Sequence, residues 1–65
     1  MIKIRIERDY KGTLQIGTMR NDNGVDTWHY ADLPPTIATR QQIEMLIATK
    51  CNGKEYSITY ATNIN

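Results

Sequence analysis

The chain has 65 residues, with 8 basic residues against 7 acidic ones and a single cysteine. A chain of this length buries only about 60% of the surface that its unfolded form exposes, which predicts one domain with a small core. Near-neutrality argues against a dedicated nucleic-acid binder, which is usually strongly basic, and a lone cysteine excludes a disulfide within the chain.

Two strands are predicted at the start of the chain. Residues 2–7 alternate isoleucine with charged side chains, which is the period-two pattern of a half-buried strand. Residues 13–20 form the second strand, whose phase is set by Leu14 and Ile16. Gly17 weakens this run and indicates a bulge or a close backbone approach.

A hairpin leads from the second strand into a third. The Asn-Gly pair at residues 23–24 lies between two strand-like runs, and this is the strongest short-range hairpin signal. The third strand then covers residues 25–31, and we expect Trp28 and Tyr30 to face the core together. The first half of the chain is therefore predicted to be an antiparallel meander.

One helix follows a break in the sheet. Pro34-Pro35 ends the third strand, because neither proline can donate a ladder hydrogen bond. Thr39 and Gln42 have the spacing of a capping box, with Thr36 as an alternative N-cap. The residues that share one side of this helix are Ile43, Leu46 and Ile47, with Lys50 and Cys51 at its end. Asn52-Gly53 predicts a left-handed end.

The last element is a fourth strand over residues 55–60, and residues 62–65 are expected to be a loose tail. The order β-β-β-α-β predicts a single compact α+β domain over residues 1–65, an antiparallel sheet with one helix packed on one face. The expected core is Ile2, Ile4, Ile6, Leu14, Ile16, Trp28, Tyr30, Ile43, Leu46, Ile47 and Ile58, with Tyr56 as a further candidate. The expected reverse face carries Lys3, Arg5, Thr13, Gln15, Thr27, His29, Ser57 and Thr59.

The sequence offers little for catalysis. The only combination of a nucleophile with a base is Cys51 with His29, and we expect the sheet to lie between these two residues. Residues 21–26 resemble a calcium loop superficially, but the ligand register fails, so turn chemistry explains them better. Asp26 and Asp32 are expected to be ordinary solvated acids. We therefore predict no enzyme activity, no cofactor and no metal site.

Nucleic-acid binding is the alternative function. Lys3, Arg5, Lys11 and Arg20 could contact phosphates on the sheet and its turns. Proteins that stack bases put aromatic side chains on an open sheet face, however, and the aromatic residues of the strands are expected in or beside the core. This alternative therefore ranks below protein binding.

Protein binding is the predicted function. The chain begins at Met1 with no attached domain in view, so we expect a free-standing cytoplasmic protein with no membrane segment. It would act as an inhibitor or regulator on a larger protein, as small proteins of phages and mobile elements do. Homodimerisation through an edge strand is a further option. The candidate contact residues are Tyr10, Lys3, Arg5, Arg20, His29 and Met45.

Overall fold

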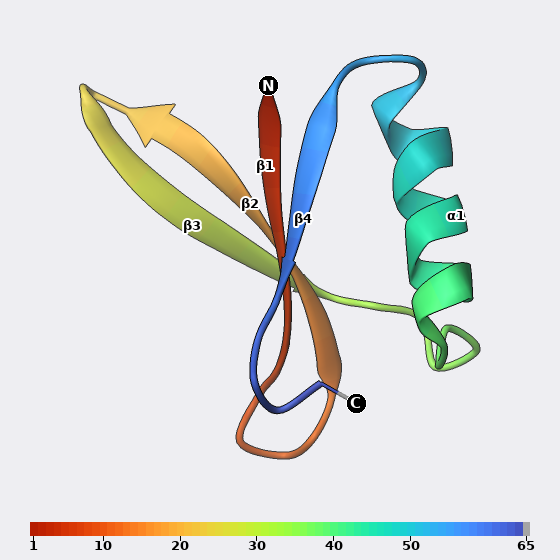
Figure 1. Cartoon of the computed structure of the whole chain (residues 1–65). Helices are drawn as coiled ribbons and strands as arrows, with labels where there is room; N and C mark the ends of the chain where they lie inside the picture. The colour runs from red at the N-terminus through yellow and green to blue at the C-terminus, as the bar shows by residue number, and fades with distance from the viewer. Residues whose placement is uncertain (65) are drawn as a thin grey trace.

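The computed structural model describes residues 1–64 and contains the five elements that the sequence predicts. Figure 1 shows a twisted sheet with one helix beside it. The elements are β1 (Ile2–Arg8), β2 (Leu14–Asp22), β3 (Val25–Asp32), α1 (Arg40–Cys51) and β4 (Tyr56–Tyr60). The α+β class and the β-β-β-α-β order are confirmed.

The sheet is mixed, and the prediction of a purely antiparallel sheet was wrong. The strand order is β3-β2-β1-β4, in which β2 is antiparallel to both β3 and β1 but β4 runs parallel to β1. The reason is the helix: its 12 residues rise about 18 Å, enough to return the chain to the end of the sheet where β1 begins. A parallel pair needs such a crossover, and Figure 1 shows α1 making this return.

The hairpin between β2 and β3 forms as predicted. Asn23 and Gly24 both have positive φ, 53° and 83°, as the two-residue turn of a tight hairpin requires. The Gly24 N–H donates to Asn21 Oδ1 over 3.1 Å, so the side chain of Asn21 stabilises the turn. The turn pairs Asp22 with Val25, and the register continues without a bulge along both strands.

The ends of α1 match the capping signals in the sequence. The Gln42 N–H donates to Thr39 Oγ1 over 3.2 Å, and the Thr39 N–H donates to Gln42 Oε1 over 3.0 Å, which completes the capping box. At the other end Asn52 is left-handed, with a φ of 49°, and Gly53 follows with a φ of 84°. The helix therefore begins and ends where its sequence predicts.

The core lies between α1 and the sheet. Its buried residues are Ile4, Ile6, Leu33, Ile43, Ile47, Cys51 and Ile64. Leu33 and Ile64 were not predicted to be buried. Ile64 contradicts the expectation of a loose tail, because its side chain is only 8% exposed and its N–H donates to Ala61 O. Asn65 lies outside the described residues.

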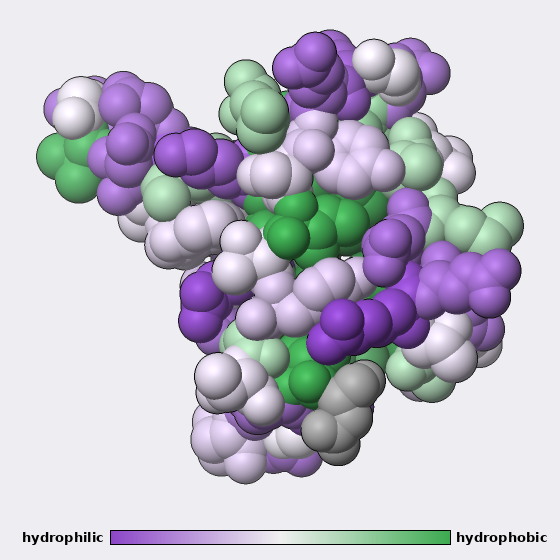
Figure 2. Space-filling model, viewed as in Figure 1, coloured by the Kyte–Doolittle hydropathy of each residue, from purple (hydrophilic) through white to green (hydrophobic). Residues whose placement is uncertain are grey.

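The hairpin of β2 and β3 projects beyond the rest of the sheet. The pairing of β2 with β1 ends at Thr18, whereas its pairing with β3 continues to Asp22. Figure 2 shows the projecting hairpin as a separate lobe whose surface is largely hydrophilic. Within residues 1–64, no helix is long and apolar enough to span a membrane.

Candidate binding face of the sheet

The register of the sheet defines which side chains share each face. Residues that lie directly opposite one another in neighbouring strands project to the same side. Ile6 lies opposite Ile16, and Ile16 lies opposite Ala31, so these three are on the side covered by α1. The side chains that alternate with them form the open face, which α1 leaves uncovered.

Trp28 and Tyr30 lie on this open face, and the prediction that they face the core was wrong. Trp28 is opposite Met19, and Tyr30 is opposite Gly17, which in turn is opposite Arg5 of β1. Trp28 is half-buried and Tyr30 is 40% exposed. The sheet thus carries two accessible aromatic side chains on the side away from its helix.

The two aromatic rings are neighbours, and the ring of Tyr30 also packs against the backbone of β2. The ring centroids of Trp28 and Tyr30 are 6.4 Å apart, and the ring planes are tilted by 32°. Tyr30 lies across Gly17 so closely that a Cβ atom on Gly17 would be 2.5 Å from Tyr30 Cε1. The close approach that Gly17 predicts is therefore the packing of an aromatic ring on a strand glycine.

Charged groups border the rings. The Arg5 Nε atom is 3.4 Å from Glu7 Oε2, and both side chains lie on the open face of β1. Burial and the nearby Glu7 carboxylate raise the pKa of Tyr30 above its ordinary value of 10.0, while the Arg5 guanidinium opposes the shift. A tyrosine hydroxyl is already neutral at physiological pH, and a raised pKa keeps it so. Beside it, the face offers the guanidinium of Arg5.

The other predicted contact residues do not join this face. His29 lies opposite Thr18 and Arg20 opposite Thr27, so all four are on the same side of the sheet as Ile16. The prediction that Thr27 and His29 share the reverse face with Lys3 and Arg5 was wrong. Three other strand residues that were predicted for the reverse face do lie on the open face, namely Gln15, Ser57 and Thr59.

The sheet does not separate Cys51 from His29, contrary to the prediction. Both side chains are on the helix side of the sheet. His29 is on β3, at one edge of the sheet, and β2 and β1 separate this strand from β4 at the other edge. The imidazole Nε2 atom of His29 is 2.7 Å from Asp22 Oδ2 at the surface, whereas Cys51 is buried in the core. A buried thiol packs like a small apolar side chain, so neither group is placed to activate the other.

Tyr10 and Met45, two of the predicted contact residues, are exposed but lie on separate parts of the surface. Tyr10 is 95% exposed in the turn between β1 and β2, with Lys11 Nζ 5.6 Å from its ring centroid. Met45 is 65% exposed on α1. Of the six predicted contact residues, only Lys3 and Arg5 lie on the open face with the aromatic rings. Sequence reasoning missed Met19, Trp28 and Tyr30 as contact residues.

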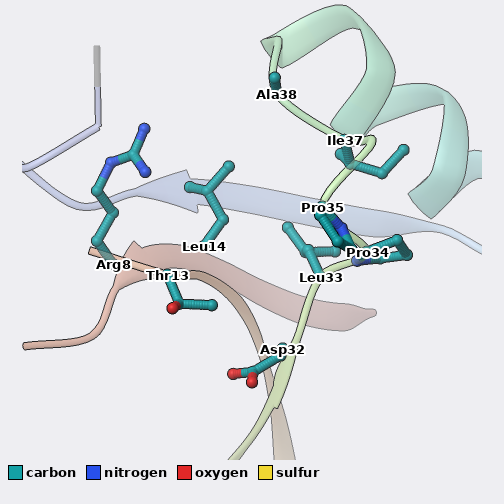
Figure 3. Close-up of a pocket in the computed structure, with 9 residues that line it drawn as sticks. All are labelled: Arg8, Thr13, Leu14, Asp32, Leu33, Pro34, Pro35, Ile37 and Ala38. Carbon is teal, nitrogen blue, oxygen red and sulfur yellow. The ribbon is translucent and has the colours of Figure 1, made fainter. Parts of the chain in front are cut away.

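A hollow of about 550 Å³ opens at the end of the sheet beneath the start of α1 (Figure 3). Leu14, Leu33 and Ile37 contribute its apolar lining. Its two charged side chains are held by local bonds: Arg8 Nη1 donates to Gly12 O over 2.9 Å, and Asp32 Oδ1 accepts from Gln15 over 2.9 Å. The polar groups therefore do not converge on a ligand position, and the hollow is a weaker candidate than the open face.

The described part of the chain holds no group of three His, Cys, Asp or Glu side chains that could bind a metal ion. The open sheet face, with accessible aromatic, methionine and arginine side chains, is the candidate binding surface of this small α+β domain. Comparison with family models, characterised proteins and solved structures gave no match to this chain.

Alkaline pH should destabilise the fold through Tyr60. Its hydroxyl donates to Glu44 Oε2 over 2.9 Å, and Arg40 lies over its ring, 4.2 Å from the centroid. Burial and the bond to Glu44 raise the pKa of Tyr60 above 10.0, opposed by Arg40. The unfolded chain therefore loses this proton first, so stability that is present below pH 10 falls as the pH rises above it.

Urea unfolding at a series of pH values from about 8 to 11, followed by circular dichroism, measures this effect. We expect Tyr60→Phe to reduce the loss of stability above pH 10, whereas Tyr10→Phe, which removes an exposed tyrosine, should leave it unchanged. Equal pH dependence in Tyr60→Phe and the unsubstituted chain would contradict the role assigned to Tyr60.

Proposed function

We propose that this protein is a small non-enzymatic binding module that attaches to a larger protein through the open face of its sheet, as an inhibitor or regulator. The observation that carries the proposal is the accessible pair of Trp28 and Tyr30 beside Met19 and Arg5. Trp, Tyr, Met and Arg are enriched at protein interfaces, and Trp, Tyr and Arg dominate their binding energy.

The construction of the face also supports binding. A paired strand already fixes the backbone positions from which these side chains project, so no backbone ordering is needed when the face is covered. Tyr30 is further restrained because its ring packs on Gly17. We place this activity in the cytoplasm, since the single cysteine, Cys51, is a free buried thiol.

Capture of partners from a lysate by the immobilised chain tests the proposal through its variants. We expect Trp28→Ala to weaken capture of a stoichiometric partner by more than about fivefold, the effect of an interface hot spot. Met45→Ala and Tyr10→Ala are matched controls, because each removes an exposed large side chain elsewhere on the surface. Circular dichroism establishes that each variant is folded.

Two results would overturn the assignment. Capture that survives Trp28→Ala but is lost in Met45→Ala or Tyr10→Ala would move the interface to the helix or to the first turn. If none of the variants changes the captured proteins, the open face is not a protein interface.

Single-stranded nucleic acid is the second candidate ligand, because bases can stack on aromatic side chains of an open sheet face. The charges favour it less. The face carries Lys3 and Arg5 but also Glu7, Asp26 and Asp32, which would repel phosphates. We expect no change in Trp28 fluorescence when single-stranded oligonucleotides are added at low salt. Quenching that disappears as salt is raised would favour this candidate instead.

A further inference from the structure

The strand that carries both aromatic side chains is at the edge of the sheet. The order β3-β2-β1-β4 places β3 with only one neighbour among the described residues. An edge strand presents unpaired N–H and C=O groups along its free side. β3 has eight residues, whereas the opposite edge strand, β4, has five, so β3 is the longer template.

The hydrogen-bond pattern identifies which residues of β3 have unpaired backbone groups. The Leu33 N–H donates to Leu14 O over 2.9 Å, which makes Leu14 and Leu33 a hydrogen-bonded pair one step beyond Gln15 and Asp32. Hydrogen-bonded and non-bonded pairs alternate along antiparallel strands. The odd-numbered residues of β3 therefore bond to β2. The residues whose backbone N–H and C=O point away from β2 are Asp26, Trp28, Tyr30 and Asp32.

These same four residues have their side chains on the open face. A strand that bonds to their backbone groups therefore also lies beside their side chains. Two aromatic side chains occupy the middle of the edge, and an aspartate stands at each end. Within residues 1–64, neither carboxylate forms an ion pair: Asp26 accepts from Asn21 Nδ2 over 3.1 Å and Asp32 from Gln15 Nε2 over 2.9 Å. No lysine or arginine occurs between Arg20 and Arg40. The edge is therefore acidic at both ends.

From this pattern we infer that β3 binds an extended segment of a partner protein as an additional antiparallel strand, flanked by basic side chains. The inference rests on the proposed protein-binding function and specifies its ligand. The segment has a basic residue, two apolar residues and a second basic residue at alternate positions. The basic residues face Asp26 and Asp32, and the apolar residues cover Trp28 and Tyr30. Backbone bonds supply affinity and the alternate side chains supply specificity.

A second copy of this chain fits the edge less well. When two β3 strands pair about a two-fold axis, only even-numbered residues can form the new hydrogen-bonded pairs. If Trp28 is opposite Tyr30 of the other copy, Asp26 is opposite Asp32 twice. If Trp28 is opposite itself, the same two carboxylates are diagonal neighbours. Like charges across strands destabilise the pair, and β3 contains no lysine or arginine to offset them.

A synthetic peptide tests the inference with the full chain. Its sequence is lysine, threonine, isoleucine, threonine, valine, threonine, lysine, with both ends blocked. We expect amide hydrogen exchange, followed by nuclear magnetic resonance, to slow at Trp28 and Tyr30 when peptide is added. Exchange at Thr27 and His29, which already bond to β2, should change little. Protection of the even-numbered amides alone indicates that the peptide adds as a strand. A peptide that only covers the open face would not select these amides.

Matched peptides and variants separate the two parts of the recognition. Methylating the backbone nitrogens of isoleucine and valine removes donors that face β3 and should abolish the protection, whereas methylating the central threonine should not. Asp26→Asn together with Asp32→Asn should weaken binding of the lysine peptide by about two- to tenfold at low salt. A peptide with glutamate in place of both lysines should bind more weakly than the lysine peptide.

Several results would overturn the inference. These are no protection at Trp28 and Tyr30 at millimolar peptide, binding that ignores backbone methylation, or equal binding of the glutamate peptide. A dimer in sedimentation that protects the same amides without peptide would assign the edge to a second copy. If capture of a partner still depends on Trp28 while these results are obtained, the proposed function stands and strand addition alone fails. Loss of that dependence would remove the proposed function itself.

Discussion

Replacing Ile47 with alanine should leave a large fraction of the protein unfolded at room temperature. Ile47 is fully buried on α1, between the helix and the sheet. Removing an isoleucine side chain from such a site costs about 2–5 kcal/mol, because transfer energy is lost and a cavity remains. A core of this size rarely provides more than about 3–5 kcal/mol of net stability. The single substitution is therefore comparable to the whole stability of the fold.

Urea unfolding followed by circular dichroism measures this loss, and a graded series tests its origin. Ile47→Val should cost only about 0.5–1.5 kcal/mol and give a folded protein with a lower midpoint. Met45→Ala is the matched control on the same helix, because Met45 is 65% exposed and surface substitutions change stability by about 0.5 kcal/mol or less. A stable, cooperatively folded Ile47→Ala protein would show that α1 contributes little to the core.

The elements of this fold follow from local signals, which is why the sequence predicts them. Alternating isoleucines define β1, and the capping box of Thr39 and Gln42 defines the start of α1. The pair of Asn23 and Gly24 adopts the positive φ values that its residue types allow. Each signal involves residues a few positions apart, so no knowledge of tertiary contacts is needed.

The phase predicted for β3 from its aromatic residues is wrong, because the register of the hairpin decides which side chains face the core. A two-residue turn at Asn23 and Gly24 pairs Asp22 with Val25. Counting back along both strands then sets Ile16 opposite Ala31 and not opposite an aromatic residue. Once Ile16 is assigned to the core, the even-numbered residues of β3 must face the other way. The signal that identifies the open face of the sheet is thus present in the turn.

The direction of β4 and the burial of Leu33 have no such local signal. The parallel pairing of β4 with β1 depends on where α1 returns the chain. Leu33 follows β3 directly and precedes Pro34, in a segment without periodicity. It is buried because its backbone remains paired with Leu14 beyond the end of the strand. Both features arise from the packing of elements against one another.

Replacing Ile64 with alanine should cost about 2 kcal/mol, although the residue lies one position from the end of the sequence. The segment before it is bound to β1. The Ala61 N–H donates to Ile6 O over 2.9 Å, and the Asn63 side chain accepts from the Arg8 N–H over 3.4 Å and donates to Arg8 O over 3.3 Å. These bonds hold the Ile64 side chain in the core cluster.

The urea midpoint measures the effect, and its expected fall is about 1–2 M for a chain of this size. Thr62→Ala is the control within the same segment, because Thr62 is exposed and should leave the midpoint almost unchanged. Asn63→Ala should fall between the two, since it removes two long hydrogen bonds to Arg8 at the surface. Equal midpoints for Ile64→Ala and Thr62→Ala would mean that the segment is the loose tail that its composition predicts. A clear difference means that the core, which has seven buried residues within residues 1–64, depends on Ile64.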